Sequence, residues 1–547
     1  MVVIKISKRD LETYSGINIE NILKFFDTIG IEIKREDENS WDLELYPDRP
    51  DLYSIFGISR ALKIFYLKKN IVYNVKNSGI NLIVDESVSN VRPYIGAALI
   101  NNVELDDSRI SYIIDMQEKL HLSIGRDRKK LAIGLHDFDK VKAPFVYKAV
   151  SGNEISFIPL GMDVKLTPEE ILKIHPKGIE YSHLLSGFSK YPVILDVDGN
   201  VLSFPPIING TLTEINKNTR NIFIDVTGTD LFSVLNALNI VTTNILELGG
   251  NPYKINVNYG KYSLELPNLG EEKYYISKKT VSEMLGENIN LKMIKETLIS
   301  MGYSVKKVGR GFRVGVPPYR IDIMHQVDIV EDVIKAYGYE NIPLSLPEKF
   351  SIGKESEVEK IKEKVRKIMV GLGYIEVMNL TFTSIERNFK TFGMEVIDSP
   401  KIENPVVEDQ IIFRTWIFPM LMETLANNRH RSLPQKIFEV GKVFRNFETV
   451  NLGAVSEESD ASFTNVKGTV ERIALSLNIK ISQQESNFPF LIDGRQSWII
   501  INGKFSGFFG EVHPLIIEKF NLGNPVTMFE IYLDTFYPKI VEEKLKF

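Results

Sequence analysis

Hydrophobic positions follow two spacings along the chain, and each spacing predicts a different element. Between residues 18 and 30 they recur every three or four residues, which predicts a helix begun by Asn18 and ended by Gly30. In VILDVDGNVLSF they alternate on both sides of Asp198 and Gly199, which predicts two strands joined by a tight turn. Because helices and strands do not alternate regularly, the sequence predicts an α+β chain with mixed or antiparallel sheets.

Breaks in these patterns divide the 547 residues into four predicted domains. Residues 1–85 form an N-terminal α/β domain, and residues 86–262 form a strand-rich domain. Residues 263–346 form a small module of helices and a strand pair. Residues 352–547 form a last α+β domain. This number of domains fits a chain of this length, at about 150 residues per domain.

Composition narrows the chemistry that the chain can perform. There is no cysteine, which excludes disulfides, thiolate zinc sites and a cysteine nucleophile. The seven histidines are scattered, so oxygen ligands must provide most of any metal site, and these favour Mg²⁺ or Ca²⁺. No run of 18 apolar residues and no signal peptide are present, so we expect a cytoplasmic protein that spans no membrane. The net charge of −5 argues against nucleic acid covering the whole surface, but a local basic patch stays open.

Four acidic side chains gather in the segment PPYRIDIMHQVDIVEDVIKAYGYENIP. We predict a helix over residues 321–337, with a buried stripe of Ile323, Val327, Val330, Ile334 and Tyr337. Asp328, Glu331 and Asp332 would then lie beside this stripe, with Asp322 at the entry to the helix. A divalent cation would relieve their mutual repulsion. A solvated acidic face near a helix N-terminus is the alternative.

A second candidate site lies on the strand NIFIDVTG, where one face carries Phe223, Asp225 and Thr227. Facing Ser203 and the loop PPIING, these side chains predict a pocket with an apolar wall and a polar hydrogen-bond acceptor. The alternative is a strand face that points into water.

Two charged loops complete the set of candidates. The run of residues 125–130, GRDRKK, either contacts phosphate or is an ordinary solvated loop. The cluster Asp48, Arg49 and Asp51, which two prolines hold in a bend, either recognises a ligand or ties down a turn.

Five groups of motifs resemble the β subunit of phenylalanyl-tRNA synthetase in its archaeal/eukaryotic form. They are PDRPDLYSIFGISRAL; GRDRKKLAIGLHDFD; PPIING with NTRNIFIDVTGTD; RIDIMHQVDIVEDVIKAYGYENIP; and FRTWIFPMLMETLANN with KIFEVGKVF. They occur in the order of that family and span nearly the whole chain. The ordered set is far more specific than any one motif.

This resemblance implies the large subunit of an α2β2 ligase that attaches phenylalanine to tRNA-Phe with ATP. The α subunit would hold the ATP and the class II active site. Residues 86–262 would be the B3/B4-like editing domain and residues 263–346 the B5-like domain. Residues 352–547 would be a class II synthetase-like domain that is structural, because a Gly-rich segment ending in arginine is missing near the C-terminus. The chain length would leave no room for the extra tRNA-binding domains of bacterial relatives.

The resemblance also implies roles for the candidate residues. Asp322, Asp328, Glu331 and Asp332 would bind Mg²⁺ in a site shared with the α subunit. Asp225, with Thr227 and Ser203, would recognise the phenol of tyrosine in mischarged Tyr-tRNA-Phe, which the editing domain would hydrolyse. Thr211 stands where bacterial relatives have a glutamate, so the hydrolytic group stays open.

Two alternatives to this function remain at the level of sequence. A free-standing aminoacyl-tRNA deacylase would need neither the acidic cluster nor the last domain. A non-catalytic scaffold subunit would have a decayed pocket, and alanine in place of Asp225 would then leave hydrolysis unchanged.

Overall fold

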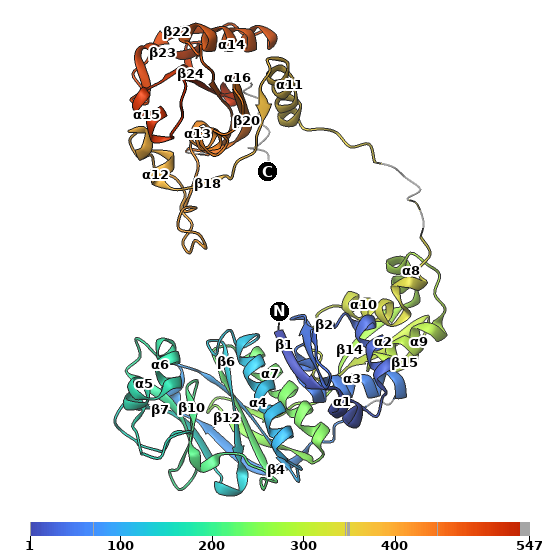
Figure 1. The fold of residues 1–547 in the computed structure, drawn as a ribbon. Coiled ribbons are helices and arrows are strands. Elements are labelled where there is room, and N and C mark those ends of the chain that lie inside the picture. Colours follow the sequence, from blue (N-terminus) through green and yellow to red (C-terminus); the bar gives the residue numbers. More distant parts are fainter. Residues whose placement is uncertain (1, 69–70, 345, 347–350, 446, 537–547) are drawn as a thin grey trace. The chain divides into compact units, whose positions relative to one another are not determined.

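The computed structural model describes residues 2–68, 71–344, 346, 351–445 and 447–536. The chain forms two compact units, Met1–Leu346 and Pro347–Phe547, and both combine helices with sheets (Figure 1). This confirms the predicted α+β multidomain class.

The N-terminal part of the first unit is a three-stranded antiparallel sheet with three helices. The strands β1 (Val2–Ser7), β3 (Ser40–Leu45) and β2 (Glu32–Glu36) lie in that order. The helices are α1 (Lys8–Ser15), α2 (Ile19–Ile29) and α3 (Ile55–Leu67). Asn18 caps α2 and Gly30 ends it in the left-handed conformation, as the sequence predicts.

A ten-stranded sheet forms the middle of the first unit, in the order β10-β9-β8-β7-β4-β12-β5-β11-β6, with β13 paired to β12. The predicted turn at Asp198 and Gly199 joins β8 to β9. The strands are β4 (Lys76–Val84), β5 (Tyr94–Asn101), β6 (Leu131–Asp137), β7 (Phe145–Ser151), β8 (Lys190–Leu195), β9 (Val201–Phe204), β10 (Ile208–Asn209), β11 (Ile222–Gly228), β12 (Asn251–Asn258) and β13 (Ser263–Leu266).

Four helices accompany this sheet: α4 (Asp107–Leu122), α5 (Pro168–Ile174), α6 (Pro176–Tyr181) and α7 (Leu231–Ile245). The segment Leu231–Leu248 is long and apolar enough to cross a membrane, yet 56% of it is buried inside the protein. Because α7 packs on β5 and β11, its apolar surface belongs to the protein core.

The last part of the first unit is small and has its own hydrophobic core. Its sheet has the order β14 (Glu272–Ser277), β16 (Gly311–Val316) and β15 (Ser304–Val308). Its helices are α8 (Lys278–Leu285), α9 (Leu291–Ser300) and α10 (Gln326–Tyr337). Helix α9 contacts α3, and α10 contacts α2, so this part packs directly on the N-terminal helices.

The second unit is built on a seven-stranded sheet in the order β17-β20-β21-β25-β24-β23-β22. All its pairs are antiparallel except β17 with β20, and two hydrophobic clusters pack on it. The sheet strands are β17 (Ile375–Glu376), β20 (Gln435–Phe444), β21 (Glu448–Glu457), β22 (Ser482–Glu485), β23 (Leu491–Ile501), β24 (Lys504–Val512) and β25 (Val526–Tyr532), and a separate pair is β18 (Phe382–Thr383) with β19 (Ile412–Phe413). The helices are α11 (Glu357–Gly371), α12 (Ile385–Asn388), α13 (Phe418–Asn427), α14 (Phe463–Ser476), α15 (Pro514–Lys519) and α16 (Leu533–Phe536).

Candidate functional site

A pocket of about 240 Å³ opens on the ten-stranded sheet, and the three predicted residues Ser203, Asp225 and Thr227 all line it. Asp225 and Thr227 come from β11, whereas Ser203 comes from β9, which lies six places away in the strand order. The sheet therefore curves enough to bring its two ends to one cavity. All three side chains are at most 3% exposed, so the alternative of a water-facing strand is wrong.

The carboxylate of Asp225 is held by a histidine that sequence reasoning missed. His136 Nε2 lies 2.8 Å from Asp225 Oδ2, and His136 Nδ1 lies 2.7 Å from Thr213 Oγ1. Because an ionised carboxylate only accepts hydrogen bonds, Nε2 donates to it. The Thr213 hydroxyl, the partner of Nδ1, also lies 3.4 Å from the Gly210 carbonyl oxygen. In the described part of the chain, this leaves Asp225 Oδ1 for a ligand.

Gly134 on β6 lies opposite Asp225 in the strand register, and its missing side chain makes this arrangement possible. A Cβ atom there would lie 2.0 Å from Asp225 Oδ2 and 2.8 Å from His136 Nε2. Phe223, the third predicted side chain of this strand face, is fully buried and packs on the ring of Phe145. It supports the pocket from within the core.

Thr227 is held by a buried arginine. Arg92 Nε donates to Thr227 Oγ1 at 3.0 Å, and its NH2 group donates to the Thr227 carbonyl at 2.9 Å. Burial lowers the pKa of Arg92 to about 10, which leaves it charged near pH 7. Since Thr227 Oγ1 accepts from Arg92, its own proton can be donated to a ligand. Next to each other on β11, Asp225 therefore offers an acceptor and Thr227 a donor.

Charged groups gather at another part of the same pocket. Arg128 donates to Glu118 Oε1 at 2.9 Å and to the Ile207 carbonyl at 2.9 Å, so it ties helix α4 to the PPIING loop. Burial would raise the pKa of Glu118, but the hydrogen bond with His121 and the charge of Arg128 outweigh it and lower that pKa to about 2. Glu118 therefore stays ionised and is a weak base.

Helix α10 begins at Gln326, so the predicted helix over residues 321–337 starts five residues too early. His325 caps it, and Asp328 Oδ2 accepts in return from the His325 backbone N–H at 2.7 Å. The predicted buried stripe is wrong in part: Val327 is 38% exposed, whereas Ile329 and Val333 are buried.

Each of the four predicted acidic ligands already has a partner. Arg320 NH2 lies 2.7 Å from Asp322 Oδ2 and 2.6 Å from Asp332 Oδ2, and it is 4% exposed. Asp332 also accepts from Tyr303, at 2.5 Å, and is 4% exposed. It lies in the core instead of beside the buried stripe. Glu331 pairs with Lys335 at 2.9 Å.

These four carboxylates nevertheless line one hollow of about 170 Å³, together with Asp48 and Arg49. Oxygen donors of this kind suit Mg²⁺. The arrangement does not suit it in this chain alone, because across the described residues no three His, Asp or Glu side chains meet as a metal-binding group. The guanidinium of Arg320 takes the place of a cation between Asp322 and Asp332.

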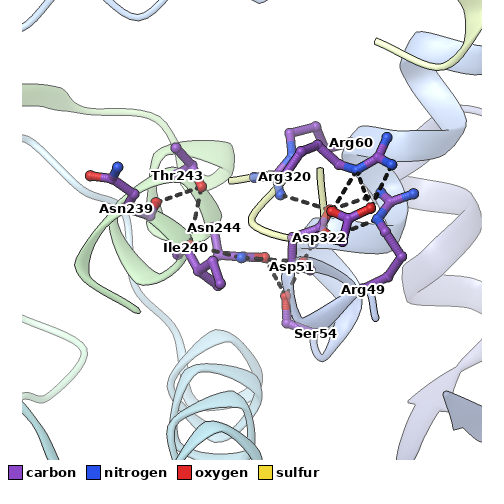
Figure 2. Close-up of polar contacts among 11 residues, drawn as sticks. Arg49, Asp51, Ser54, Arg60, Asn239, Ile240, Thr243, Asn244, Arg320 and Asp322 are labelled. Carbon is purple, nitrogen blue, oxygen red and sulfur yellow. Dashed lines mark hydrogen bonds and ion pairs between the residues drawn. The ribbon is translucent and has the colours of Figure 1, made fainter. Parts of the chain in front are cut away.

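The cluster of Arg49 and Asp51 ties down a turn, which was one of its two predicted roles. Arg49 donates to both carboxylate oxygens of Asp51, at 2.8 and 2.9 Å, and Arg60 lies 3.7 Å from the same group (Figure 2). Figure 2 shows Arg320 and Asp322 beside this pair. Asn244 accepts from Ser54 at 2.6 Å, which joins the turn to helix α7.

Comparison with known proteins places these parts in one class. Residues 98–244 match the B3/4 domain, residues 274–339 match the tRNA synthetase B5 domain, and residues 342–533 match the phenylalanyl tRNA synthetase beta chain CLM domain. The structure is similar to an N-terminal fragment of the phenylalanyl-tRNA synthetase β subunit from Pyrococcus horikoshii, with a TM-score of 0.59 and 37% identity. That similarity covers 62% of this chain and all of the fragment. The chain is thus an aminoacyl-tRNA synthetase subunit.

The particular family follows from full-length relatives. The phenylalanine–tRNA ligase beta subunit of Methanosarcina barkeri is 41% identical over 98% of this chain and 99% of its own length. The corresponding subunit of Archaeoglobus fulgidus is 37% identical over 98% of this chain and 99% of its own length. The chain belongs to the family of phenylalanine–tRNA ligase beta subunits. A β subunit of this ligase works with an α partner.

Replacing Arg320 with methionine should destabilise the first unit strongly. The change leaves two acids without their counter-charge, and breaking a buried ion pair typically costs about 3–5 kcal/mol. Thermal unfolding of the full chain measures the effect. Lys335→Met is the matched control, because its pair with the exposed Glu331 contributes about 0–1 kcal/mol. Equal melting temperatures for the two variants would contradict a supporting role for Arg320.

Proposed function

We propose that this β subunit edits the errors of the ligase by hydrolysing Tyr-tRNA-Phe in the pocket between β9 and β11. The observation that carries the proposal is the pairing of a buried acceptor, Asp225 Oδ1, with a buried donor, the Thr227 hydroxyl. A buried phenol hydroxyl donates one hydrogen bond and accepts another, so it needs both an acceptor and a donor. A pocket of about 240 Å³ lies below the roughly 300–1,000 Å³ of drug-sized ligand sites, so it suits one side chain.

The need for such a pocket follows from the energetics of discrimination. A ligase site shaped for phenylalanine rejects an analogue that only adds a hydroxyl by about 10²-fold. A site that hydrogen-bonds the hydroxyl discriminates better, because phenylalanine would leave the desolvated oxygen of Asp225 unpaired, at a cost of about 1–3 kcal/mol. Selection in the editing pocket therefore complements selection in the ligase site.

Replacing Asp225 with alanine should lower the ratio of Tyr-tRNA to Phe-tRNA hydrolysis about ten-fold or more. A hydrogen bond to a charged group is worth about 1.5–3 kcal/mol, which corresponds to a factor of roughly 10–100 in selectivity. The ratio of kcat/KM for deacylation of the two substrates by the ligase complex measures it. Asp198→Asn changes an exposed acid on the β8–β9 turn and is the control. An unchanged ratio would show that Asp225 does not recognise the hydroxyl of the tyrosyl group.

We further propose that the α subunit holds the ATP-dependent class II active site in a cytoplasmic α2β2 tetramer that charges tRNA-Phe. The second unit would be a class II synthetase-like domain without ATP chemistry. Its largely antiparallel seven-stranded sheet supports the first part of this reading, and its buried ion pair of Arg414 with Glu439 supports the second. Arg414 and Glu439 are paired with each other and at most 4% exposed, so neither is available to a nucleotide.

Aminoacylation should require both chains. Co-expression of this chain with a class II α candidate should give a complex with the mass of α2β2, measured by light scattering. Charging of tRNA-Phe should appear only in that complex, since we assign the ATP site to the α subunit. The lone β chain is the control. A stable monomer that charges tRNA unaided would contradict both the subunit composition and the location of the active site.

We also propose that Asp322, Asp328, Glu331 and Asp332 hold Mg²⁺ once the α subunit is bound. Their shared hollow and all-oxygen chemistry support this. The ion would neutralise charge at the contact between the two chains. Since Arg320, Lys335 and backbone N–H groups occupy these carboxylates in the chain described here, the site needs ligands from a partner.

Binding of Mn²⁺, used as a paramagnetic substitute for Mg²⁺, should therefore be weak for the isolated chain and tight for the complex. Electron paramagnetic resonance titration measures both affinities. Glu331→Gln should weaken binding to the complex by about ten-fold or more, because it removes a charged oxygen ligand. Glu340→Gln is the matched control, because Glu340 is exposed and does not line the hollow. Equal affinity of the Glu331 variant and the control would contradict the site.

A further inference from the structure

The basic turn of residues 125–130 has an unusual backbone for so polar a segment. Arg126, Asp127 and Arg128 all have positive φ angles, of 47°, 53° and 63°. A left-handed conformation costs roughly 1–2 kcal/mol for each non-glycine residue. Strain of this kind persists where the surrounding structure enforces it and is concentrated at functional sites. An ordinary solvated loop of the same length could avoid this left-handed conformation and its energetic cost.

Both ends of the turn are anchored. Gly125 N donates to the Leu120 carbonyl at the end of α4, and Lys130 N donates to the Gly125 carbonyl at 2.8 Å. A side chain at Gly125 would place its Cβ 2.4 Å from the His121 carbonyl oxygen, so only glycine fits there. The conformation of the turn is thus imposed by helix α4, which also supplies Glu118 to the pocket.

The anchored turn sorts its basic side chains into two groups. Arg128 points inward, where it contacts Glu118 and the Ile207 carbonyl and lies 4.5 Å from the ring of Tyr181. Lys130 pairs with Asp230 at 3.3 Å.

Arg126 and Lys129 form the outward group. Both are exposed, and neither forms an ion pair with any residue that the structure describes. Two unpaired cations therefore flank Arg128, a residue of the pocket lining.

The charges around these two cations are mixed, and the exposed acid Glu214 also lines the pocket. Lys177 lines the same pocket and pairs with the exposed Glu180 at 3.0 Å. The nearest acid in the turn, Asp127, accepts a hydrogen bond from Tyr181 at 3.4 Å. Glu118 is already engaged by Arg128. What distinguishes Arg126 and Lys129 is that neither has an ion-pair partner among the described residues, beside the pocket that we assign to the tyrosyl group.

We propose that the turn of residues 125–130 is a phosphate clamp, in which Arg126 and Lys129 bind the backbone phosphates of the single-stranded 3′ end that carries the aminoacyl ester. This inference rests on the proposed editing function. A ligand whose aminoacyl group enters the pocket must bring the phosphates of its last nucleotides to the surrounding surface. Cationic residues on a fixed backbone bind phosphate with a smaller loss of conformational entropy than those on a flexible loop. This gain would offset the strain of the turn.

The test uses the ligase complex and compares the double variant Arg126→Ala/Lys129→Ala with Lys261→Ala/Lys273→Ala. The control removes two exposed lysines that do not line the pocket. Two substrates are hydrolysed: Tyr-tRNA-Phe, and tyrosyl-adenosine, an ester without any phosphate. Binding of an RNA minihelix with a single-stranded 3′ end is measured by fluorescence anisotropy at several salt concentrations.

We expect the clamp variant to raise KM for Tyr-tRNA-Phe roughly ten-fold with kcat unchanged, and to leave tyrosyl-adenosine hydrolysis at the level of the control. Its minihelix binding should be weaker, with a salt dependence shallower by about 1.4 in the log–log slope, which corresponds to two lost phosphate contacts on a single strand.

Two results would overturn the clamp. Equal losses on both substrates would mean that the turn only positions Arg128, and values equal to those of the control would mean that the turn is a solvated loop. If the unmodified complex hydrolyses neither ester, the editing function fails, and the minihelix measurement still decides the clamp by itself.

Discussion

An ionised side chain that leaves water must meet its counter-charge inside the protein, and this constraint organises the first unit. Arg320 is almost fully buried, and the carboxylates of Asp322 and Asp332 lie within 3 Å of its NH2 group. Such a buried group adds little net stability, because desolvation offsets the attraction, but losing one member is costly. The segments that carry these residues are therefore held in one arrangement.

The same constraint connects the parts of the unit. Asp51 anchors the turn before α3 through Arg49, and Asn244 on α7 reaches the same turn through Ser54. Helix α7 in turn packs on β5 and β11, and β11 carries the pocket residues Asp225 and Thr227. A polar network at the N-terminal turn thus supports the strand that forms the pocket. If the turn were a flexible loop, helix α7 would lose its hydrogen bond to Ser54, and β11 would lose the support that α7 provides.

Much of the fold was predictable because local rules determine it. The cap at Asn18, the turn at Gly199 and the strand of residues 221–228 all follow from spacing and turn chemistry. The start of α10 was missed because histidine is an unusual cap: His325 and Asp328 form a reciprocal capping box that the usual serine or threonine pattern does not reveal. The burial of Asp332 was missed for another reason: its partners Arg320 and Tyr303 lie outside the helix, so helical spacing does not reveal them.

The candidate pocket shows where a single sequence stops being sufficient. Alternation along β11 placed Asp225 and Thr227 on one face, but His136 lies in β6, where every residue is buried and no polar pattern marks it. Its relation to Asp225 depends on strand pairing across Gly134. The meeting of Ser203 with this group depends on the curvature of a ten-stranded sheet. Both are properties of tertiary structure, on which local propensity carries no information.

The hydrogen bonds of Asp225 explain how a carboxylate can be buried in a binding pocket without a ligand. Full pairing of both oxygens would stabilise the empty pocket and leave nothing to recognise a phenol. An unpaired carboxylate would be too costly to bury. His136 satisfies one oxygen and, through Thr213, is itself satisfied. Among the described residues one acceptor therefore remains unpaired, and under the proposed editing function the energetic difference between tyrosine and phenylalanine would be concentrated at that atom.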